Sequence, residues 1–285
     1  AAAVGAARVE GAELGSSALE FEPHGLAAGR YAFDVGSAGS AGLVLQAVLP
    51  GLLRASGRSV LEVVGGTHNR AAPPFEVLDR ALLPLLRRMG AEVELTMLRP
   101  GFEPAGGGVY RLEVAGPARL EPLELVEPGA VESMRLTVWL SRLPRHIAER
   151  EVAEVRRRPG FEGVAVEIRE VAAAGPGNAL ALELGFPGHA VVIAGFGARG
   201  VPAEQVAGTA AREAKGLLRS GAAVDVHLAD QLLVVMALAG GGSFTTDAAS
   251  SHATTNAAVI ELFLPVTVRF ESLANDLWLS VVAPR

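Results

Sequence analysis

Strand-like runs alternate with apolar helical runs along most of this chain, and Gly-rich turns separate them. The clearest case begins with a strand at residues 30–35, a small-residue turn at 36–40 and a helix across 43–52. A buried strand at 60–64 and a second helix at 75–89 follow, and the helices have apolar residues at helical spacing. Elements that alternate over short turns pack as helices on sheets. We therefore predict an α/β fold built of α+β layers.

Three segments of the chain have this rhythm, and the third extends to the C-terminus. A run of glycines at 240–242 separates its first helix from the strand that follows. Its predicted elements are helices 222–238 and 250–263 and strands 243–246, 266–270 and 277–282. The two ends of the chain therefore share one type of architecture.

The middle of the chain differs in character and forms an α/β unit of its own. Its predicted elements are strands 132–143, 164–171, 179–184 and 190–196 and helices 145–158 and 202–218. Pro- and Gly-rich sequence precedes this unit, and Ser220 and Gly221 follow it. Its length of roughly ninety residues is an ordinary domain size. We predict that residues 129–219 form a domain inserted into a core of residues 1–128 and 220–285.

Composition sets limits on the kind of protein this is. A chain of 285 residues suits one large domain or two domains, and a hydrophobic content of 50% excludes intrinsic disorder. Cysteine is absent, which excludes disulfides, thiolate zinc sites and cysteine nucleophiles. No apolar run reaches the roughly 18 residues of a membrane helix, and the start does not resemble a secretory signal. We therefore expect a cytoplasmic protein with no membrane partner.

The charge of the chain argues against nucleic-acid binding by the molecule as a whole. The formal net charge is −6, so any RNA contact must come from a local basic patch. Two basic clusters, at 144–146 and 156–158, lie in the predicted insertion. A solvated helix face is the first interpretation of these clusters, and RNA contact is the second.

His252 is the first candidate for chemistry, because it follows a Gly-rich break at the start of a predicted helix. A helix N-terminus offers free N–H groups and a positive dipole end, which suit phosphate. An imidazole nitrogen can also attack phosphorus and carry a nucleotidyl group. For a lone histidine, a capping or partly buried residue bonded to the backbone is the commoner explanation.

Asp230 and Gln231 are the second candidates, since they interrupt an otherwise apolar helix. A carboxylate buried there is costly unless it is paired or binds a ligand or metal. The alternative is a simple exposed stripe, because His227, Asp230 and Gln231 fall at positions i, i+3 and i+4. Spacing alone does not separate the two.

Two small-residue turns are weaker candidates. Residues 36–40, continued by Gln46 on the following helix, could cradle a phosphate, although the turn is neither a Walker A loop nor a dinucleotide fingerprint. Residues 65–69 follow a buried strand at its carboxyl end, where α/β sheets commonly hold ligands. Tight packing and a plain loop are the respective alternatives.

Seven short segments follow one another along the chain. They are 36–40 with 45–50, 65–69 with 72–74, 99–102 with 104–108, 144–151, 175–178, 228–231 and 251–252. Their order resembles the RNA 3′-terminal phosphate cyclase family. The resemblance covers essentially the whole chain, and seven segments in order are specific although each alone is weak.

The resemblance implies a core of repeated units, each with two helices over a four-stranded sheet, and a smaller inserted α/β domain. It implies a ligase of RNA processing in which a histidine takes AMP from ATP and passes it to an RNA 3′-phosphate. Attack by the 2′-hydroxyl then gives a 2′,3′-cyclic phosphodiester. ATP and a divalent cation, Mg²⁺ or Mn²⁺, are the expected cofactors, RNA with a 3′-phosphate end is the expected partner, and a homodimer stays open.

Matching residues carry roles over from the family. His252 matches the nucleophile. The positions that match nucleotide-binding residues are Gln46, Pro73, His227, Leu228, Ala229, Asp230 and Gln231. The family opens with a Glu-Gly-Gly-Gly-Gln element that contributes metal and phosphate contacts, and nothing here matches it. We therefore expect an incomplete first repeat, unknown metal ligands and little cyclisation by this 285-residue chain.

Three other functions compete with this assignment. One is a non-catalytic cyclase-like factor in ribosome biogenesis, which the presence of His252 disfavours because such proteins lack the nucleophilic histidine. A non-catalytic RNA-binding module is disfavoured by the net charge of −6. An α/β enzyme of small-molecule metabolism is the third, and it would not form a histidine–nucleotide adduct.

Overall fold

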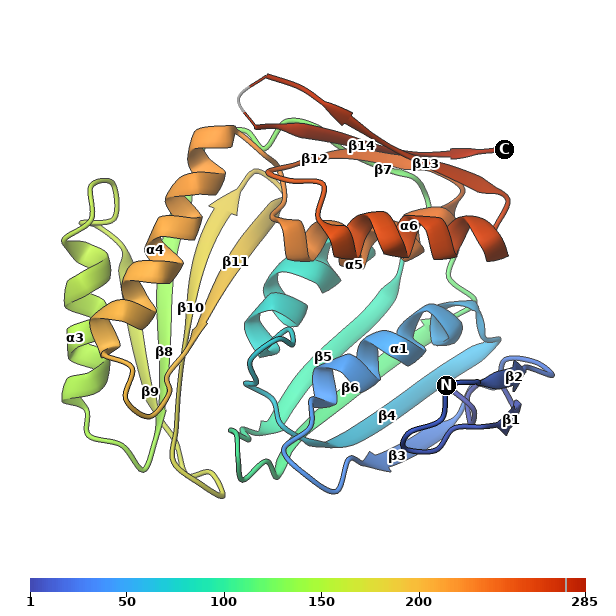
Figure 1. Ribbon diagram of the computed structural model, residues 1–285, viewed down its shortest axis with the longest axis horizontal. Coiled ribbons are helices and arrows are strands. Elements are labelled where there is room, and N and C mark those ends of the chain that lie inside the picture. The colour runs from blue at the N-terminus through green and yellow to red at the C-terminus, as the bar shows by residue number, and fades with distance from the viewer. Residues whose placement is uncertain (275) are drawn as a thin grey trace.

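The computed structural model of the protein describes residues 1–274 and 276–285 and has the predicted mixed α/β architecture. Three four-stranded sheets and one two-stranded hairpin are present in this part of the chain (Figure 1). Two of the four-stranded sheets belong to the core, and the third belongs to the middle of the chain.

The first core unit is a sheet whose strands lie in the order β3-β4-β6-β5, with β3 parallel to β4 and the other pairs antiparallel. Its elements are β3 (Arg30–Asp34), α1 (Ala41–Arg54), β4 (Gly57–Gly65), η1 (Val77–Leu82), α2 (Leu83–Arg88), β5 (Glu92–Arg99) and β6 (Gly108–Gly116).

The second core unit repeats the first one strand for strand. Its sheet has the order β7-β12-β14-β13, again with only the first pair parallel. Its elements are β7 (Leu123–Leu125), α5 (Val226–Ala239), β12 (Gly242–Thr246), α6 (Ser251–Phe263), β13 (Val266–Ser272) and β14 (Trp278–Pro284). The predicted repeat of two helices over a four-stranded sheet is thus present twice in the described residues.

The two units face each other through their helices, and the sheets lie outside (Figure 1). A single hydrophobic cluster includes buried side chains of α1, α2, α5 and α6, among them Leu52, Leu86 and Leu233. α1 begins at Ser40, whose hydroxyl accepts the Leu43 N–H group, and its apolar face is buried. The helix-to-helix interface therefore forms the centre of the core.

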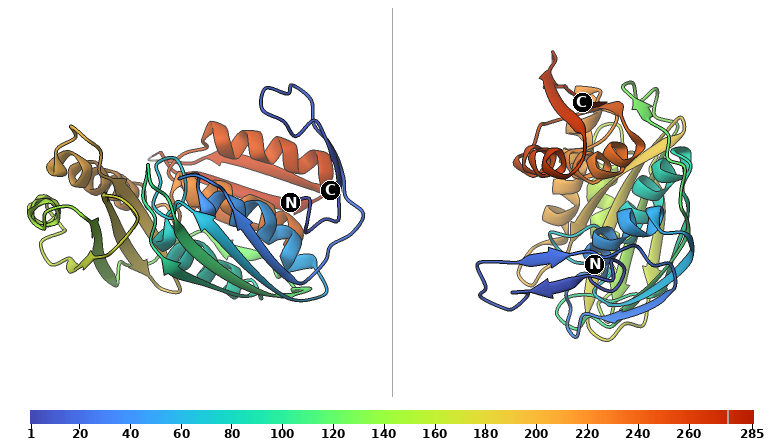
Figure 2. Two further views of the ribbon diagram at one scale, coloured as in Figure 1. Left: turned by 90° about the horizontal axis from the view of Figure 1, so that it is seen from below. Right: turned by 90° about the vertical axis from the view of Figure 1, so that its right-hand side faces the viewer.

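The middle of the chain forms a sheet with the order β11-β10-β8-β9, which differs from the core order. Its elements are β8 (Ser133–Ser141), α3 (His146–Arg156), β9 (Ala165–Glu170), β10 (Gly177–Phe186), β11 (His189–Phe196) and α4 (Ala203–Ser220). They lie between β7 and α5 in sequence and at one end of the molecule, while both chain termini lie at the other end (Figure 2). A second hydrophobic cluster consists almost entirely of side chains from this insertion. The exact bounds 129–219 stay a prediction.

Some predicted elements differ from the observed ones. The helix predicted across 75–89 is π-helical at Val77–Leu82 before it becomes α-helical. In an α-helix the backbone carbonyl of Arg80 would accept a hydrogen bond from residue 84. Pro84 has no N–H group to donate, and its ring displaces the Arg80 carbonyl. Three short strands were not predicted, namely β1 (Arg8–Glu10), β2 (Glu20–Glu22) and β7. Among the described residues, no helix is long and apolar enough to cross a membrane.

Candidate active site

Helices from the two core units, namely α1, η1, α2, α5 and α6, enclose a hollow of about 260 Å³. Its polar lining residues are Gln46 from α1, Asp230 and Gln231 from α5, and Asn256 from α6. Segments separated by more than 180 residues therefore meet here. Apolar side chains of α1, α2 and α5, including Leu49 and Val234, form the rest of the wall.

α5 presents some of its predicted site residues to the hollow and buries others. The helix begins at Asp225, whose carboxylate accepts the Leu228 N–H group at 2.9 Å. Leu228 and Ala229 are fully buried in the core, and their side chains do not line the hollow. Asp230 and Gln231 are half-buried and line the hollow. The interruption of the apolar helix thus marks its hollow-facing side.

His227 does not line the hollow and is exposed beside a carboxylate cluster. Burial raises the pKa of Asp225 to about 6, and burial also raises the pKa of Asp247 and Glu213 above their ordinary values. The His227 imidazole opposes all three shifts, so it lies within electrostatic reach of these carboxylates.

Asn256 ties α6 to α5 at the rim of the hollow. Its Nδ2 group donates to the backbone oxygen of Asp230 at 3.0 Å and to Oδ1 of the same residue at 2.9 Å. Gln231 Oε1 is buried and accepts no hydrogen bond from any described residue. A buried acceptor without a donor is unfavourable, so the hollow is complementary to a ligand that donates hydrogen bonds.

His252 is the second residue of α6 and is exposed. The helix is capped by Ser250, whose hydroxyl accepts the Ala253 N–H group at 3.1 Å, and its first turn contains no acidic residue. His252 lies four residues before Asn256, so the two side chains share one face of the helix. The positive end of α6 and the imidazole are therefore about one turn from the hollow.

Pro73 lies against the first turn of α1 and does not line the hollow. A Cβ atom on Gly42 would come within 2.8 Å of the Pro73 backbone oxygen, so only glycine permits this close approach. Gly42 is one turn before Gln46 on α1. Pro73 is therefore beside the site and outside its wall.

The loop at 65–69 is not a plain surface loop, because its His68 side chain belongs to a buried polar cluster. His68 is 3% exposed, and its Nε2 atom lies 3.4 Å from Oε2 of the buried Glu76. Burial raises the pKa of Glu76, but the nearby His68, the Glu76 backbone and the Trp139 indole together outweigh it and hold that pKa below its ordinary value. The indole of Trp139 donates to Glu76 Oε1 at 2.5 Å. Sequence spacing gave no sign of this cluster, because Trp139 comes from the insertion.

The basic clusters of the insertion are partly neutralised. Arg157 and Arg158 share the buried Glu154, and Arg145 pairs with Glu149 and Glu170. These pairs fit the first interpretation, a solvated helix face, and contact of the clusters with RNA stays a prediction.

No group of three or more His, Asp or Glu side chains that could hold a metal ion occurs in residues 1–274 and 276–285. No residue is assigned to the expected divalent cation.

Comparison with known proteins identifies the family. The sequence profile of RNA 3′-terminal phosphate cyclases matches residues 1–270. The chain is 46% identical over 273 residues to a protein of that name from Ectopseudomonas mendocina, with 94% of this chain and 79% of the relative covered. Identity is 48% over 279 residues with a relative of the same name from Pseudomonas fluorescens (97% and 81% covered) and 49% over 274 residues with one from Ralstonia nicotianae (95% and 78% covered). The chain belongs to the RNA 3′-terminal phosphate cyclase family.

Proposed function

We propose that this protein uses ATP to convert the 3′-phosphate end of an RNA into a 2′,3′-cyclic phosphodiester, with His252 as the nucleophile that carries AMP. The observation that supports this most strongly is the meeting of Gln46, Asp230 and Gln231 at one hollow. Its remaining polar residue, Asn256, is one helical turn from His252.

The polarity of the hollow favours one orientation of the nucleotide. Asp230 and Gln231 offer acceptor oxygens, which suit the hydroxyls of a ribose and the amino group of adenine but repel phosphates. The start of α6 has the opposite character, since its N–H groups and dipole favour phosphate. The nucleoside therefore occupies the hollow, and the α-phosphate lies toward His252.

Three displacements at phosphorus complete the reaction. An unprotonated imidazole nitrogen of His252 attacks the α-phosphorus of ATP, and the bond to the pyrophosphate oxygen breaks. An oxygen of the RNA 3′-phosphate then attacks the same phosphorus, and the phosphorus–nitrogen bond breaks to leave AMP on the RNA end. Finally the 2′-hydroxyl attacks the 3′-phosphorus, releases its proton and expels AMP. The adjacent 2′-hydroxyl is held close to the activated phosphorus, which favours ring closure.

A divalent cation is part of the proposed reaction. Mg²⁺ or Mn²⁺ would offset the charge of the triphosphate.

The cyclisation assay tests this proposal. Full-length protein is incubated with ATP, Mg²⁺ and an RNA that carries a labelled 3′-phosphate. We expect the label to become resistant to phosphatase and AMP to accumulate in equal amount. Label that stays phosphatase-sensitive while the protein is folded would show that the family fold here serves another function.

A further inference from the structure

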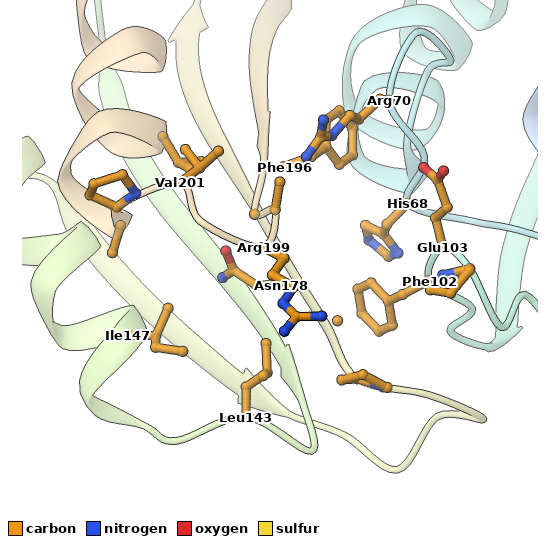
Figure 3. Close-up of a pocket in the computed structure, with 18 of the residues that line it drawn as sticks. His68, Arg70, Phe102, Glu103, Leu143, Ile147, Asn178, Phe196, Arg199 and Val201 are labelled. Atoms are coloured by element: carbon orange, nitrogen blue, oxygen red, sulfur yellow. The ribbon is translucent and has the colours of Figure 1, made fainter.

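A second and larger cavity lies between the core and the insertion, away from the hollow of α1, α5 and α6. Its volume is about 820 Å³, within the usual range for small-molecule sites. Phe102 and His68 come from the core side, and Asn178, Phe196 and Arg199 come from the insertion (Figure 3). Four of the seven segments that carry the family resemblance meet at this cavity, and the proposed reaction uses none of these cavity residues.

The two sides of the cavity are held in fixed positions. Arg80 of η1 pairs with Glu183 of β10 at 3.0 Å, and Trp139 of β8 is hydrogen-bonded to Glu76. A Cβ atom on Gly177 would overlap the Phe102 ring at 2.1 Å, so the core loop presses directly on the start of β10. The cavity is therefore preformed rather than a gap between loosely joined parts.

Asn178 is a buried polar side chain in the wall of this cavity. It is 8% exposed, and its Nδ2 group donates to Glu151 Oε2 at 3.0 Å and to the Trp139 backbone oxygen at 3.4 Å. These acceptors fix the amide so that Oδ1 faces Gly197, which lines the cavity. The cavity thus holds one oriented acceptor, which suits an N–H group of a nucleobase.

The walls and rim of the cavity match the rest of a nucleotide. Phe102 and Phe196 supply aromatic surface, on which any base can stack. Arg70 and Arg199 are exposed and make no ion pair or side-chain hydrogen bond with a described residue, whereas the third guanidinium, Arg150, is taken by Glu204. Two uncommitted guanidiniums beside one carboxylate, Glu103, give the lining a positive balance in a chain of net charge −6.

One short loop of the chain joins the wall of the cavity to the first turn of α1. Arg70 lines the cavity, and Pro73 packs against the first turn of α1, one turn before Gln46. Pro73 is three positions after Arg70, so their Cα atoms lie within roughly 11 Å of each other. A strand held at the cavity can therefore extend toward the helices that form the hollow.

We propose that this cavity binds a nucleotide of the single-stranded RNA substrate upstream of the reacting 3′ end, with its base between Phe196 and Asn178 and its phosphates near Arg70 and Arg199. The choice of RNA over a free nucleotide rests on the proposed function and on the connection to the hollow. The cavity then selects RNA of sufficient length, while the chemistry stays at His252.

Direct binding tests the proposal without requiring catalysis. The probes are a labelled RNA of about 12 nucleotides with a 3′-phosphate and a 3′-phosphorylated dinucleotide, measured by fluorescence anisotropy at several salt concentrations. Phe196→Leu keeps an apolar side chain but removes the stacking surface, and it should weaken binding of the long RNA roughly five- to tenfold. Binding of the dinucleotide should not change.

Arg199→Ala supplies an independent variant at an exposed position, where folding is not at risk. It should reduce the magnitude of the negative slope of log K against log salt by about 0.7, as expected for one lost phosphate contact on a single strand. Arg219→Ala is the matched control, since Arg219 is exposed on α4 of the same insertion and does not line the cavity. This control should leave the slope unchanged.

Two results would overturn the assignment. If Arg199→Ala and Arg219→Ala weaken RNA binding equally, the effect is due to the overall charge of the protein and not to the cavity. If free AMP displaces the long RNA from the cavity, the site belongs to a free nucleotide. Covalent labelling by ATP is measured in parallel and should be equal in the parent and in Phe196→Leu. If ATP does not label the parent protein, the proposed reaction is contradicted, and the binding result is unaffected.

Discussion

Replacement of Glu151 by glutamine should make the protein more stable at alkaline pH and leave its stability almost unchanged at acidic pH. Glu151 lies on α3 with 0% exposure, and only one of its two carboxyl oxygens accepts a hydrogen bond, from Asn178. Burial raises the pKa of the Glu151 carboxyl from 4.5 to about 7, although the Asn178 amide opposes the shift. A carboxyl with a raised pKa is favoured in its protonated form by the folded state.

The sign and size of the effect follow from linkage. Below about pH 4.5 the carboxyl is protonated in both the folded and the unfolded protein, so no charge is buried. Between about pH 4.5 and 7 the unfolded chain loses the proton first, and the free energy of unfolding falls. Since each pKa unit corresponds to about 1.36 kcal/mol, the loss is complete above pH 7 at about 3 kcal/mol. Glutamine has the shape of the protonated acid and avoids this loss.

Urea denaturation followed by tryptophan fluorescence measures the effect, because Trp139 belongs to the insertion. We expect Glu151→Gln to gain about 3 kcal/mol at pH 8 and less than about 1 kcal/mol at pH 4.5. Glu149→Gln is the control, since Glu149 is exposed on the same helix and its pair with Arg145 is a surface pair. An equal change in unfolding free energy at both pH values, or a loss of stability at pH 8, would contradict the interpretation of Glu151 as a buried carboxylate without a charged partner.

Four further changes test the site and the core. Asp230→Ala and Gln46→Ala should each reduce adenylation at least tenfold in protein whose thermal unfolding is unchanged, because both side chains line the hollow beside α6. Asp225→Asn keeps the helix cap and removes a carboxylate whose pKa is about 6, so its gain in unfolding free energy should grow from pH 4 to pH 7 and level off near 2–3 kcal/mol, read from urea titrations. Leu52→Ala should cost about 2–5 kcal/mol in the same titration, since Leu52 is fully buried between the sheet and the helices.

Local pattern predicted most helices and strands because each carries its own periodicity. α1 and α6 begin where a serine precedes the apolar run, and the two core units repeat this order. β7 was missed because a strand of three residues is too short to show a period, and only its pairing with β12 defines it. The π-helical turn before Pro84 was missed because it depends on one lost backbone donor.

The site was only partly accessible from sequence. Spacing showed that Asp230 and Gln231 interrupt an apolar helix, but it could not show that Gln46 meets them, since that contact depends on how the two units face each other. The family resemblance supplied that expectation. The His68–Glu76 pair and the cavity at Phe196 depend on how the insertion docks, and no local pattern encodes that arrangement.

Covalent transfer of AMP to His252 is the most direct test of the central claim. Full-length protein is incubated with α-labelled ATP and Mg²⁺, and the adduct is mapped by digestion and mass spectrometry. We predict one labelled residue, His252, with a bond that is labile to acid and stable to base, as expected for a phosphoramidate. His252→Asn should abolish the label and retain the thermal unfolding of the parent. Labelling of His252→Asn to the level of the parent would contradict the account.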